Sequence, residues 1–199
     1  MNVNTGFENL IKLLTLGDSG VGKTNFIFRF IENQFTETHV STIGFDFKSQ
    51  ILTLPNKKVI KLQIWDTAGQ ERYMSVNKNL FLRVQGILLI YDISNRESFE
   101  HITNWISNIR ELCANIPIIL IGNKTDLDDI RVVATSEGQQ IADEHNLEFL
   151  ETSSKTGINV REAFINISEK VLAECNLKRS DGTSIQNKKK GYNNESKCC

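Results

Sequence analysis

Apolar residues gather in short, nearly continuous runs along the chain, at residues 10–16, 86–91, 116–121 and 147–150. Successive side chains of a strand point to opposite faces, so such runs indicate strands that are covered on both sides. Between the runs, apolar residues recur at three- and four-residue spacing, which predicts amphipathic helices. This alternation predicts an α/β fold in which helices cover both faces of a mostly parallel sheet.

One pair of predicted strands breaks the alternation. Residues 45–54 and 58–65 are separated only by Pro55, Asn56 and Lys57, a turn-like link that is too short for a crossover helix. This spacing predicts an antiparallel hairpin. The predicted fold is therefore a three-layer α/β fold with a six-stranded, mostly parallel sheet that contains one antiparallel strand.

Two of the predicted helices begin with capping signals. Ser94 has Glu97 three residues later, and Asn159 has Glu162 three residues later. A side-chain oxygen at such a position accepts a hydrogen bond from an N–H of the first helical turn. We therefore expect helices to begin at Ser94 and at Asn159.

Length and composition limit the organisation of the chain. The 199 residues, 40% hydrophobic and 24% charged, fit one globular domain with a tail, and the net charge of −1 gives no general attraction to nucleic acid. We expect a domain at residues 1–175 and a flexible tail at residues 176–199, where apolar residues become few. No run approaches the roughly 18 apolar residues that span a bilayer. The four cysteines show no disulfide framework, which favours a reducing compartment.

Residues 17–24 read GDSGVGKT, which matches the phosphate-loop pattern G-x-x-x-x-G-K-[ST], and they lie between a predicted strand and a predicted helix. The glycines allow backbone N–H groups to surround phosphate oxygens. Lys23 brings a cation to the β and γ phosphates, and Thr24 offers a hydroxyl group to Mg²⁺. A glycine-rich turn that only caps a helix is the alternative. The loop does not select the base, because adenine-nucleotide enzymes share it.

Two further motifs favour guanine. Residues 123–126 read NKTD, and the carboxylate of Asp126 can accept both the N1–H and the exocyclic amine of guanine, a pair of donors that adenine lacks. Alone, this motif is equally compatible with a solvated turn. Residues 152–155 read TSSK after the last predicted strand and are placed to close the base pocket.

A third group of residues is suited to sensing and hydrolysing the γ-phosphate. In the sequence DTAGQ at residues 66–70, Asp66 can hold Mg²⁺ through water, the N–H of Gly69 can meet the γ-phosphate, and Gln70 can orient the attacking water. The alternative is a simple turn after a strand. Thr42 offers a second hydroxyl ligand, which engages only when the γ-phosphate is present.

Together these motifs resemble those of the Ras-like small GTPases. IGFDF at residues 43–47, KLQIW at 61–65 and the pair Arg72-Tyr73 resemble signatures of the Rab family. The resemblance implies that Phe35 stacks on guanine, and that Ser19 is compatible with catalysis because Rab proteins often carry serine there. It implies catalytic roles for Gln70 and Lys23, and Mg²⁺ binding by Thr24, Thr42 and, through water, Asp66. The implied contacts with GTP or GDP are made by Ser19, Gly20, Val21, Gly22, Lys23, Thr24, Asn25, Phe35, Thr42, Gly69, Asn123, Lys124, Asp126, Leu127, Ser153, Ser154 and Lys155.

The resemblance also implies an exposed apolar surface that effectors read, formed by Phe47, Trp65 and the residue at position 80. Residues 80–84 read LFLRV where the family typically has Tyr-Tyr-Arg-Gly-Ala, so Leu80 replaces an aromatic residue. This departure affects the expected choice of partners rather than the nucleotide chemistry. The alternative is that Phe47 and Trp65 are simply buried strand residues.

The chain ends in two cysteines, which resemble the double geranylgeranylation signal of Rab proteins. Lipidation of Cys198 and Cys199 through a Rab escort protein implies peripheral association with the cytosolic face of an intracellular or plasma membrane, favoured by the lysines at residues 188–190. A GDP-dissociation inhibitor would maintain a cytosolic pool. A disordered end or a weak metal clip is the alternative.

The expected function is a Rab-like cycle between GTP-bound active and GDP-bound inactive states that regulates vesicle trafficking, with an exchange factor, a GTPase-activating protein and effectors as partners. The alternatives are a GTP-locked scaffold, a Ras- or Rho-type signalling GTPase, and a P-loop ATPase or nucleoside kinase. The three histidines share no metal-site spacing, and we expect His39, His101 and His145 to be solvated. Trp105 is expected to be a core residue.

Overall fold

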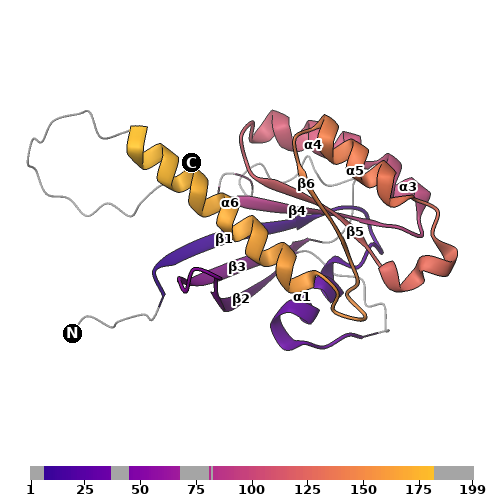
Figure 1. Cartoon of the computed structure of the whole chain (residues 1–199), viewed down its shortest axis with the longest axis horizontal. Helices are drawn as coiled ribbons and strands as arrows, with labels where there is room; N and C mark the ends of the chain where they lie inside the picture. The colour runs from indigo at the N-terminus through magenta and orange to yellow at the C-terminus, as the bar shows by residue number, and fades with distance from the viewer. Residues whose placement is uncertain (1–6, 37–44, 68–80, 82, 182–199) are drawn as a thin grey trace, which may run out of the picture.

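The computed structural model describes residues 7–36, 45–67, 81 and 83–181. Its centre is a six-stranded sheet with the strand order β2-β3-β1-β4-β5-β6 (Figure 1). The strands are β1 (Asn9–Leu16), β2 (Phe45–Thr53), β3 (Val59–Thr67), β4 (Gly86–Asp92), β5 (Ile118–Asn123) and β6 (Glu148–Thr152). β2 pairs antiparallel with β3, and every other neighbouring pair is parallel. The predicted sheet is confirmed.

Helices cover the sheet on both faces and complete the three layers. Residues of α1 (Lys23–Glu32) and α6 (Val160–Asp181) share one hydrophobic cluster with the sheet. Residues of α3 (Arg96–Glu100), α4 (Ile102–Leu112) and α5 (Thr135–Glu144) share a second cluster on the opposite face. A 3₁₀ helix, η2 (Thr125–Ile130), follows β5.

Strand β4 shows why the apolar runs are continuous. Leu88 and Ile90 belong to the cluster with α1 and α6, whereas Leu89 and Tyr91 belong to the cluster with α4 and α5. All seven residues of the strand are buried. Desolvation raises the pKa of the Tyr91 hydroxyl group, and among the described residues this group has no hydrogen-bond partner. The hydroxyl group therefore stays neutral at physiological pH.

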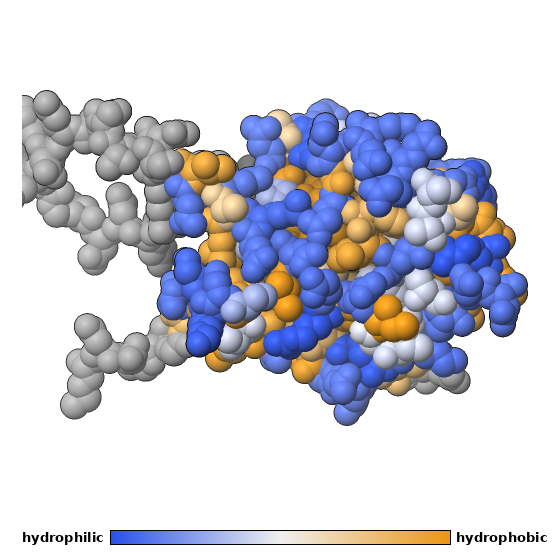
Figure 2. Space-filling model, viewed as in Figure 1, coloured by the Kyte–Doolittle hydropathy of each residue, from blue (hydrophilic) through white to orange (hydrophobic). Residues whose placement is uncertain are grey.

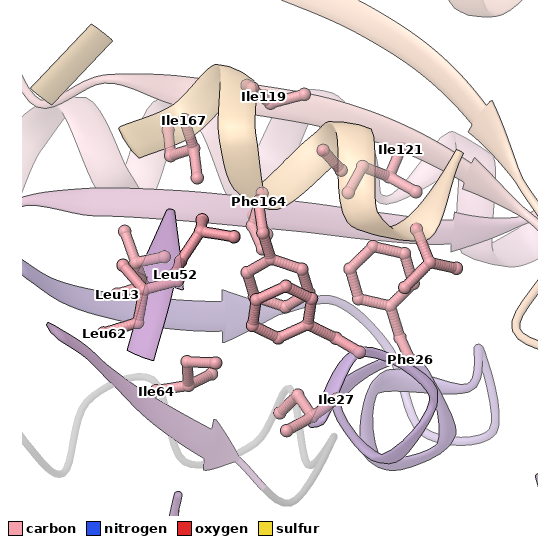
Figure 3. Packing of buried hydrophobic residues seen from close by; sticks show 14 of the residues in the cluster. Leu13, Phe26, Ile27, Leu52, Leu62, Ile64, Ile119, Ile121, Phe164 and Ile167 are labelled. Atoms are coloured by element: carbon pink, nitrogen blue, oxygen red, sulfur yellow. The ribbon is translucent and has the colours of Figure 1, made fainter. Parts of the chain in front are cut away.

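Aromatic packing fixes the helix that follows the phosphate loop. The ring centroid of Phe164 on α6 lies 5.4 Å from that of Phe26 and 3.9 Å from that of Phe30, both on α1. Figure 3 shows the rings of Phe26 and Phe164 among the aliphatic side chains of the sheet. Because these rings are buried, their packing stabilises α1 and sets its orientation against α6.

The turn and the helix ends differ in how well the sequence predicted them. The hairpin turn is confirmed: Lys57 adopts a φ of 67°, and its N–H donates to the carbonyl of Leu54. The predicted cap at Ser94 is wrong, because Asn95 caps α3 by accepting from the N–H of Ser98. The hydroxyl group of Ser94 instead donates to Asp92 at the end of β4.

Helix α6 starts directly after Asn159, as predicted, and its C-terminal end differs from expectation. It continues to Asp181, across the predicted boundary between residues 175 and 176, so the first residues of the predicted tail are helical. Polar residues such as Asn176 cost little in a helix, so the loss of apolar residues does not by itself end one. Residues 182–199 lie outside the described part of the chain, and the predicted domain division stays a prediction.

The molecular surface is mainly hydrophilic on the face shown in Figure 2, with smaller apolar patches between the polar residues. Within the described residues, no helix has the length and apolar character required to cross a membrane.

Candidate nucleotide-binding site

An open cleft of about 200 Å³ lies at the carboxyl ends of the parallel strands, the edge where α/β proteins of this type bind ligands. It joins the phosphate loop to the two segments that were predicted to read guanine. Its lining residues are Gly20, Gly22, Asn25, Phe35, Thr36, Asn123, Lys124, Asp126, Leu127, Ser154 and Lys155. Every one of them except Thr36 was a predicted nucleotide contact.

The phosphate loop connects β1 to the first turn of α1. Gly22 immediately precedes the helix with a φ of 97°, and a Cβ at this position would lie 2.6 Å from the amide nitrogen of Asn123. The loop therefore brings backbone N–H groups to a helix N-terminus, which favours an anion. Ser19 is exposed beside the cleft, whereas the side chain of Val21 is buried in the core. Only the backbone of Val21 is available to a phosphate.

Lys23 begins α1 and is buried. Its ammonium group donates to the carbonyl of Gly17 at 2.8 Å and to the carbonyl of Asp18 at 2.6 Å. A buried charge requires such partners, because burial removes its hydration. These contacts hold the cation against the loop that was predicted to surround the phosphates.

Two predicted magnesium ligands meet at the phosphate end of the cleft. The hydroxyl group of Thr24 donates to Oδ2 of Asp66 at 2.7 Å, which joins α1 to the end of β3. Asp66 is 3% exposed. Thr24 and Asp66 are therefore close enough to act on one ion. The third predicted ligand, Thr42, lies outside the described residues.

Asn123 is fully buried and links the phosphate loop to the segment 152–155 that was predicted to close the base pocket. Its amide nitrogen donates to the carbonyl of Val21 at 2.9 Å. Its amide oxygen accepts from the hydroxyl group of Thr152 and from the backbone N–H and hydroxyl group of Ser154. Asn123 therefore fixes the geometry of the cleft in addition to lining it.

Lys124 is held by a buried carboxylate. Its ammonium nitrogen lies 2.7 Å from Oδ2 of Asp92, whose side chain is 8% exposed. Lys124 also adopts a φ of 73°, in the left-handed region. The ion pair keeps the side chain along the cleft wall.

The carboxylate of Asp126, which was predicted to read the base, is oriented by Ser153. The hydroxyl group of Ser153 donates to Oδ1 of Asp126 at 2.5 Å. Ser153 is buried and Asp126 is exposed at the cleft. The contact indicates that Ser153 positions Asp126, whereas Ser154 and Lys155 line the cleft themselves.

Thr36 was missed by the sequence interpretation, although it is adjacent to Phe35. Its carbonyl accepts from the amide nitrogen of Asn25 at 3.0 Å, which ties this wall of the cleft to α1. Only its position after Phe35 could have indicated that Thr36 lines the cleft. Its contact is made by a backbone carbonyl, which every residue type has.

A brace between the phosphate loop and α4 was also missed. His101 Nδ1 lies 2.6 Å from Oδ2 of Asp18, and the indole N–H of Trp105 donates to Oδ1 of the same carboxylate at 2.8 Å. The expectation that His101 is solvated holds only in part, because 37% of its side chain is exposed but its ring contacts Asp18. Trp105 is buried, as expected, but its indole N–H binds Asp18 of the phosphate loop. The four-residue spacing of His101 and Trp105 places both on one helix face. This spacing was the only feature of the sequence that could have indicated a shared partner.

The predicted effector residues are partly described. Phe47 and Trp65 form a cross-strand pair with ring centroids 5.2 Å apart. Phe47 is 41% exposed and Trp65 is half-buried, so the alternative that both are core residues fails for Phe47. Other predicted residues lie outside the described part: Thr42, Gly69, Gln70, Leu80, Cys198 and Cys199.

The fold and the phosphate loop define a class of protein, the P-loop proteins, with a cleft lined by residues that were predicted to contact a guanine nucleotide. The model of the Ras family matches residues 12–173. The chain is 45% identical to Ras-related protein Rab-10 of Diplobatis ommata over 195 residues, which cover 97% of each sequence. It is also 45% identical to Ras-related protein Rab-8B of Homo sapiens, over 89% of this chain and 86% of that protein. Ras-related protein Rab-15 of Rattus norvegicus is 45% identical over 88% of this chain and 82% of that protein.

The chain belongs to the Ras family and is a Rab-like small GTPase. It is accordingly a GTP hydrolase that binds guanine nucleotides and regulates vesicle trafficking through regulator and effector partners. Adenine-nucleotide chemistry is thereby excluded as the alternative.

Proposed function

We propose that this chain binds GTP with Mg²⁺ in the described cleft, hydrolyses it with the help of Gln70, and acts as a switch on a membrane. The observation that carries the proposal is that one cleft is lined both by Gly20 and Gly22 of the phosphate loop and by Asp126 and Lys155. The phosphate end and the base end of a nucleotide are thus served by a single site.

The residues at the phosphate end fit Mg²⁺. Thr24 and Asp66 offer a hydroxyl and a carboxylate oxygen 2.7 Å apart, and Mg²⁺ prefers oxygen ligands together with waters and substrate phosphates. When bound, the ion neutralises charge on the β- and γ-phosphate oxygens. Thr42 is proposed to join these ligands only in the GTP state.

Hydrolysis transfers the γ-phosphoryl group to water. Gln70 orients the water for attack on the γ-phosphorus, and the bond from that phosphorus to the β–γ bridging oxygen breaks, which leaves GDP and phosphate. Lys23 stabilises the charge on these oxygens. Loss of the γ-phosphate releases Thr42 and the Gly69–Gln70 segment, which changes the surface that partners read. The roles proposed for Thr42 and for the Gly69–Gln70 segment rest on the family resemblance. The exposed ring of Phe47, which lies beside Trp65, supports the proposal that effectors bind at this surface.

The Gln70→Leu variant tests the catalytic role. Loss of the group that orients water is expected to slow single-turnover GTP hydrolysis by about tenfold to a hundredfold, while GTP binding stays close to wild type. Gln139→Leu is the matched control, since Gln139 is exposed on α5 and bonds to Asp143. Equal rates for Gln70→Leu and wild type would sink the assigned role. A wild-type protein that binds GTP without hydrolysing it, even with a GTPase-activating protein, would favour the GTP-locked scaffold.

Membrane anchoring is proposed to depend on geranylgeranyl groups at Cys198 and Cys199. Two chains give stable anchoring where a single chain is marginal. Replacing both cysteines with serine is expected to move the protein from the membrane pellet to the cytosolic fraction of expressing cells. Cys113→Ser, which changes a partly buried cysteine of the domain, serves as the control. Unchanged membrane association of the double variant would refute the anchor.

A further inference from the structure

Arg29, in the last turn of α1, contacts Ser154 and Lys155, which line the cleft, and Asn33, which lies two residues before the lining residue Phe35. Its Nε donates to the carbonyl of Ser154 at 2.8 Å, and one terminal nitrogen donates to the carbonyl of Lys155 at 2.5 Å. The other terminal nitrogen donates to the carbonyl and to the side-chain oxygen of Asn33, at 2.9 and 3.2 Å. Arg29 itself is not a lining residue.

The groups that Arg29 contacts belong to two segments that are far apart in the sequence. Ser154 and Lys155 line the cleft after β6, and they are more than a hundred residues away in the sequence. Asn33 ends α1 in the left-handed conformation, with a φ of 52°, and leads into Phe35, which also lines the cleft. A single side chain therefore joins the end of α1, just before Phe35, to the segment of Ser154 and Lys155.

The geometry requires the guanidinium group in particular. Its N–H donors lie in one rigid plane and here point to acceptors of two separate segments, whereas an ammonium group is a point donor on a flexible stem. All four recorded acceptors are carbonyl or amide oxygens rather than carboxylates. The contacts thus fix backbone position, and they do so with charge-assisted bonds, which are stronger than neutral ones.

We propose that Arg29 is a positioning residue for the guanine base, which sets how long the nucleotide stays bound and how strongly guanine is preferred. The proposal rests on the proposed binding of guanine nucleotide in this cleft. Arg29 acts through Ser154, Lys155 and the segment that carries Phe35, and it touches no nucleotide atom.

The Arg29→Lys variant tests the proposal with a base-dependent measurement. Its dissociation of GDP in excess Mg²⁺ is expected to be about tenfold faster than wild type, because at least two charge-assisted bonds are lost. Dissociation is measured in parallel for the diphosphate of 2-aminopurine riboside, which lacks the C6 oxygen and the N1–H of guanine. This analogue makes fewer base contacts, so its dissociation should accelerate by a clearly smaller factor.

Arg110→Lys is the matched control for lost stability. Arg110 also donates to two backbone carbonyls, those of Ala114 at 3.0 Å and Ile116 at 2.9 Å, but it does so beyond the end of α4. Its melting temperature is expected to fall comparably while GDP dissociation stays at the wild-type rate. Asn33→Gly keeps the left-handed backbone and removes one acceptor, so it should accelerate GDP dissociation in the same direction by a smaller factor.

The outcomes separate the two levels of the hypothesis. If Arg29→Lys and Asn33→Gly release GDP at the wild-type rate, or if GDP and the analogue accelerate equally, the positioning role is overturned and the GTPase stands. If the wild-type protein retains no guanine nucleotide, the proposed function fails and the role of Arg29 fails with it.

Discussion

Replacing Gly17 with alanine is expected to destabilise the folded protein by about 4 kcal/mol or more. A Cβ at this position would lie 2.0 Å from the carbonyl oxygen of Ile90, far inside any real contact distance. Ile90 is a fully buried residue of the central strand β4, so the strand cannot move aside without disrupting the sheet. Gly17 also has a φ of 131°, a conformation that L side chains rarely adopt.

Gly20→Ala is the control that separates backbone strain from the clash. Gly20 has a φ of 80°, but an added Cβ would meet nothing within 4 Å, so only the strain of about 1–2 kcal/mol is expected. Equilibrium urea unfolding of the nucleotide-free proteins measures both values without a contribution from bound ligand. A cost at Gly17 no larger than that at Gly20 would contradict the close approach of the loop to β4.

The fold was largely predictable because its signals are local and redundant. The run at residues 86–91 could only be apolar throughout if both faces of β4 were covered, and the structure covers both. The three residues from Pro55 to Lys57 left no room for a crossover helix. Each inference needed only neighbouring residues and a geometric constraint on the chain.

Errors arose where several local solutions had similar energy. Ser94 and Asn95 are both good caps, and the choice between them depends on Asp92, which takes the hydroxyl group of Ser94. The end of α6 was not determined by the sequence either, since the residues after 175 are mostly polar but tolerate a helix. Propensity alone does not resolve such cases.

In the candidate site, too, local sequence patterns could be predicted, whereas contacts between distant segments could not. The roles of the phosphate loop and Asp126 could be predicted because their chemistry demands particular residue types at fixed spacing, and the structure brings them to one cleft. The partners of Asp18 and Arg29 could not be predicted, since these contacts join segments that only the folded sheet brings together. Polar tips on otherwise apolar or solvated side chains, such as the indole of Trp105, give no sequence signal of the atom that they bind.

Asp126→Asn is expected to invert the base preference of the cleft. A carboxylate accepts both the N1–H and the amine of guanine, whereas an amide offers one acceptor and one donor. The donor then faces the guanine amine, and GTP affinity should fall by about a thousandfold. Xanthine carries a carbonyl in place of that amine, so xanthosine triphosphate gains a matched pair. Ser153 already bonds Oδ1, which keeps the side chain in place.

Competition between GTP and xanthosine triphosphate for a fluorescent nucleotide measures this inversion. Asp129→Asn makes the same substitution at an exposed acid of η2 outside the cleft lining, and it should leave the preference for GTP unchanged. Retained GTP preference in Asp126→Asn would show that Asp126 does not read the base. A loss of affinity for both nucleotides would instead assign Asp126 to the structure of its loop. Inversion distinguishes recognition from stability, because a merely damaged site has no reason to gain a new ligand.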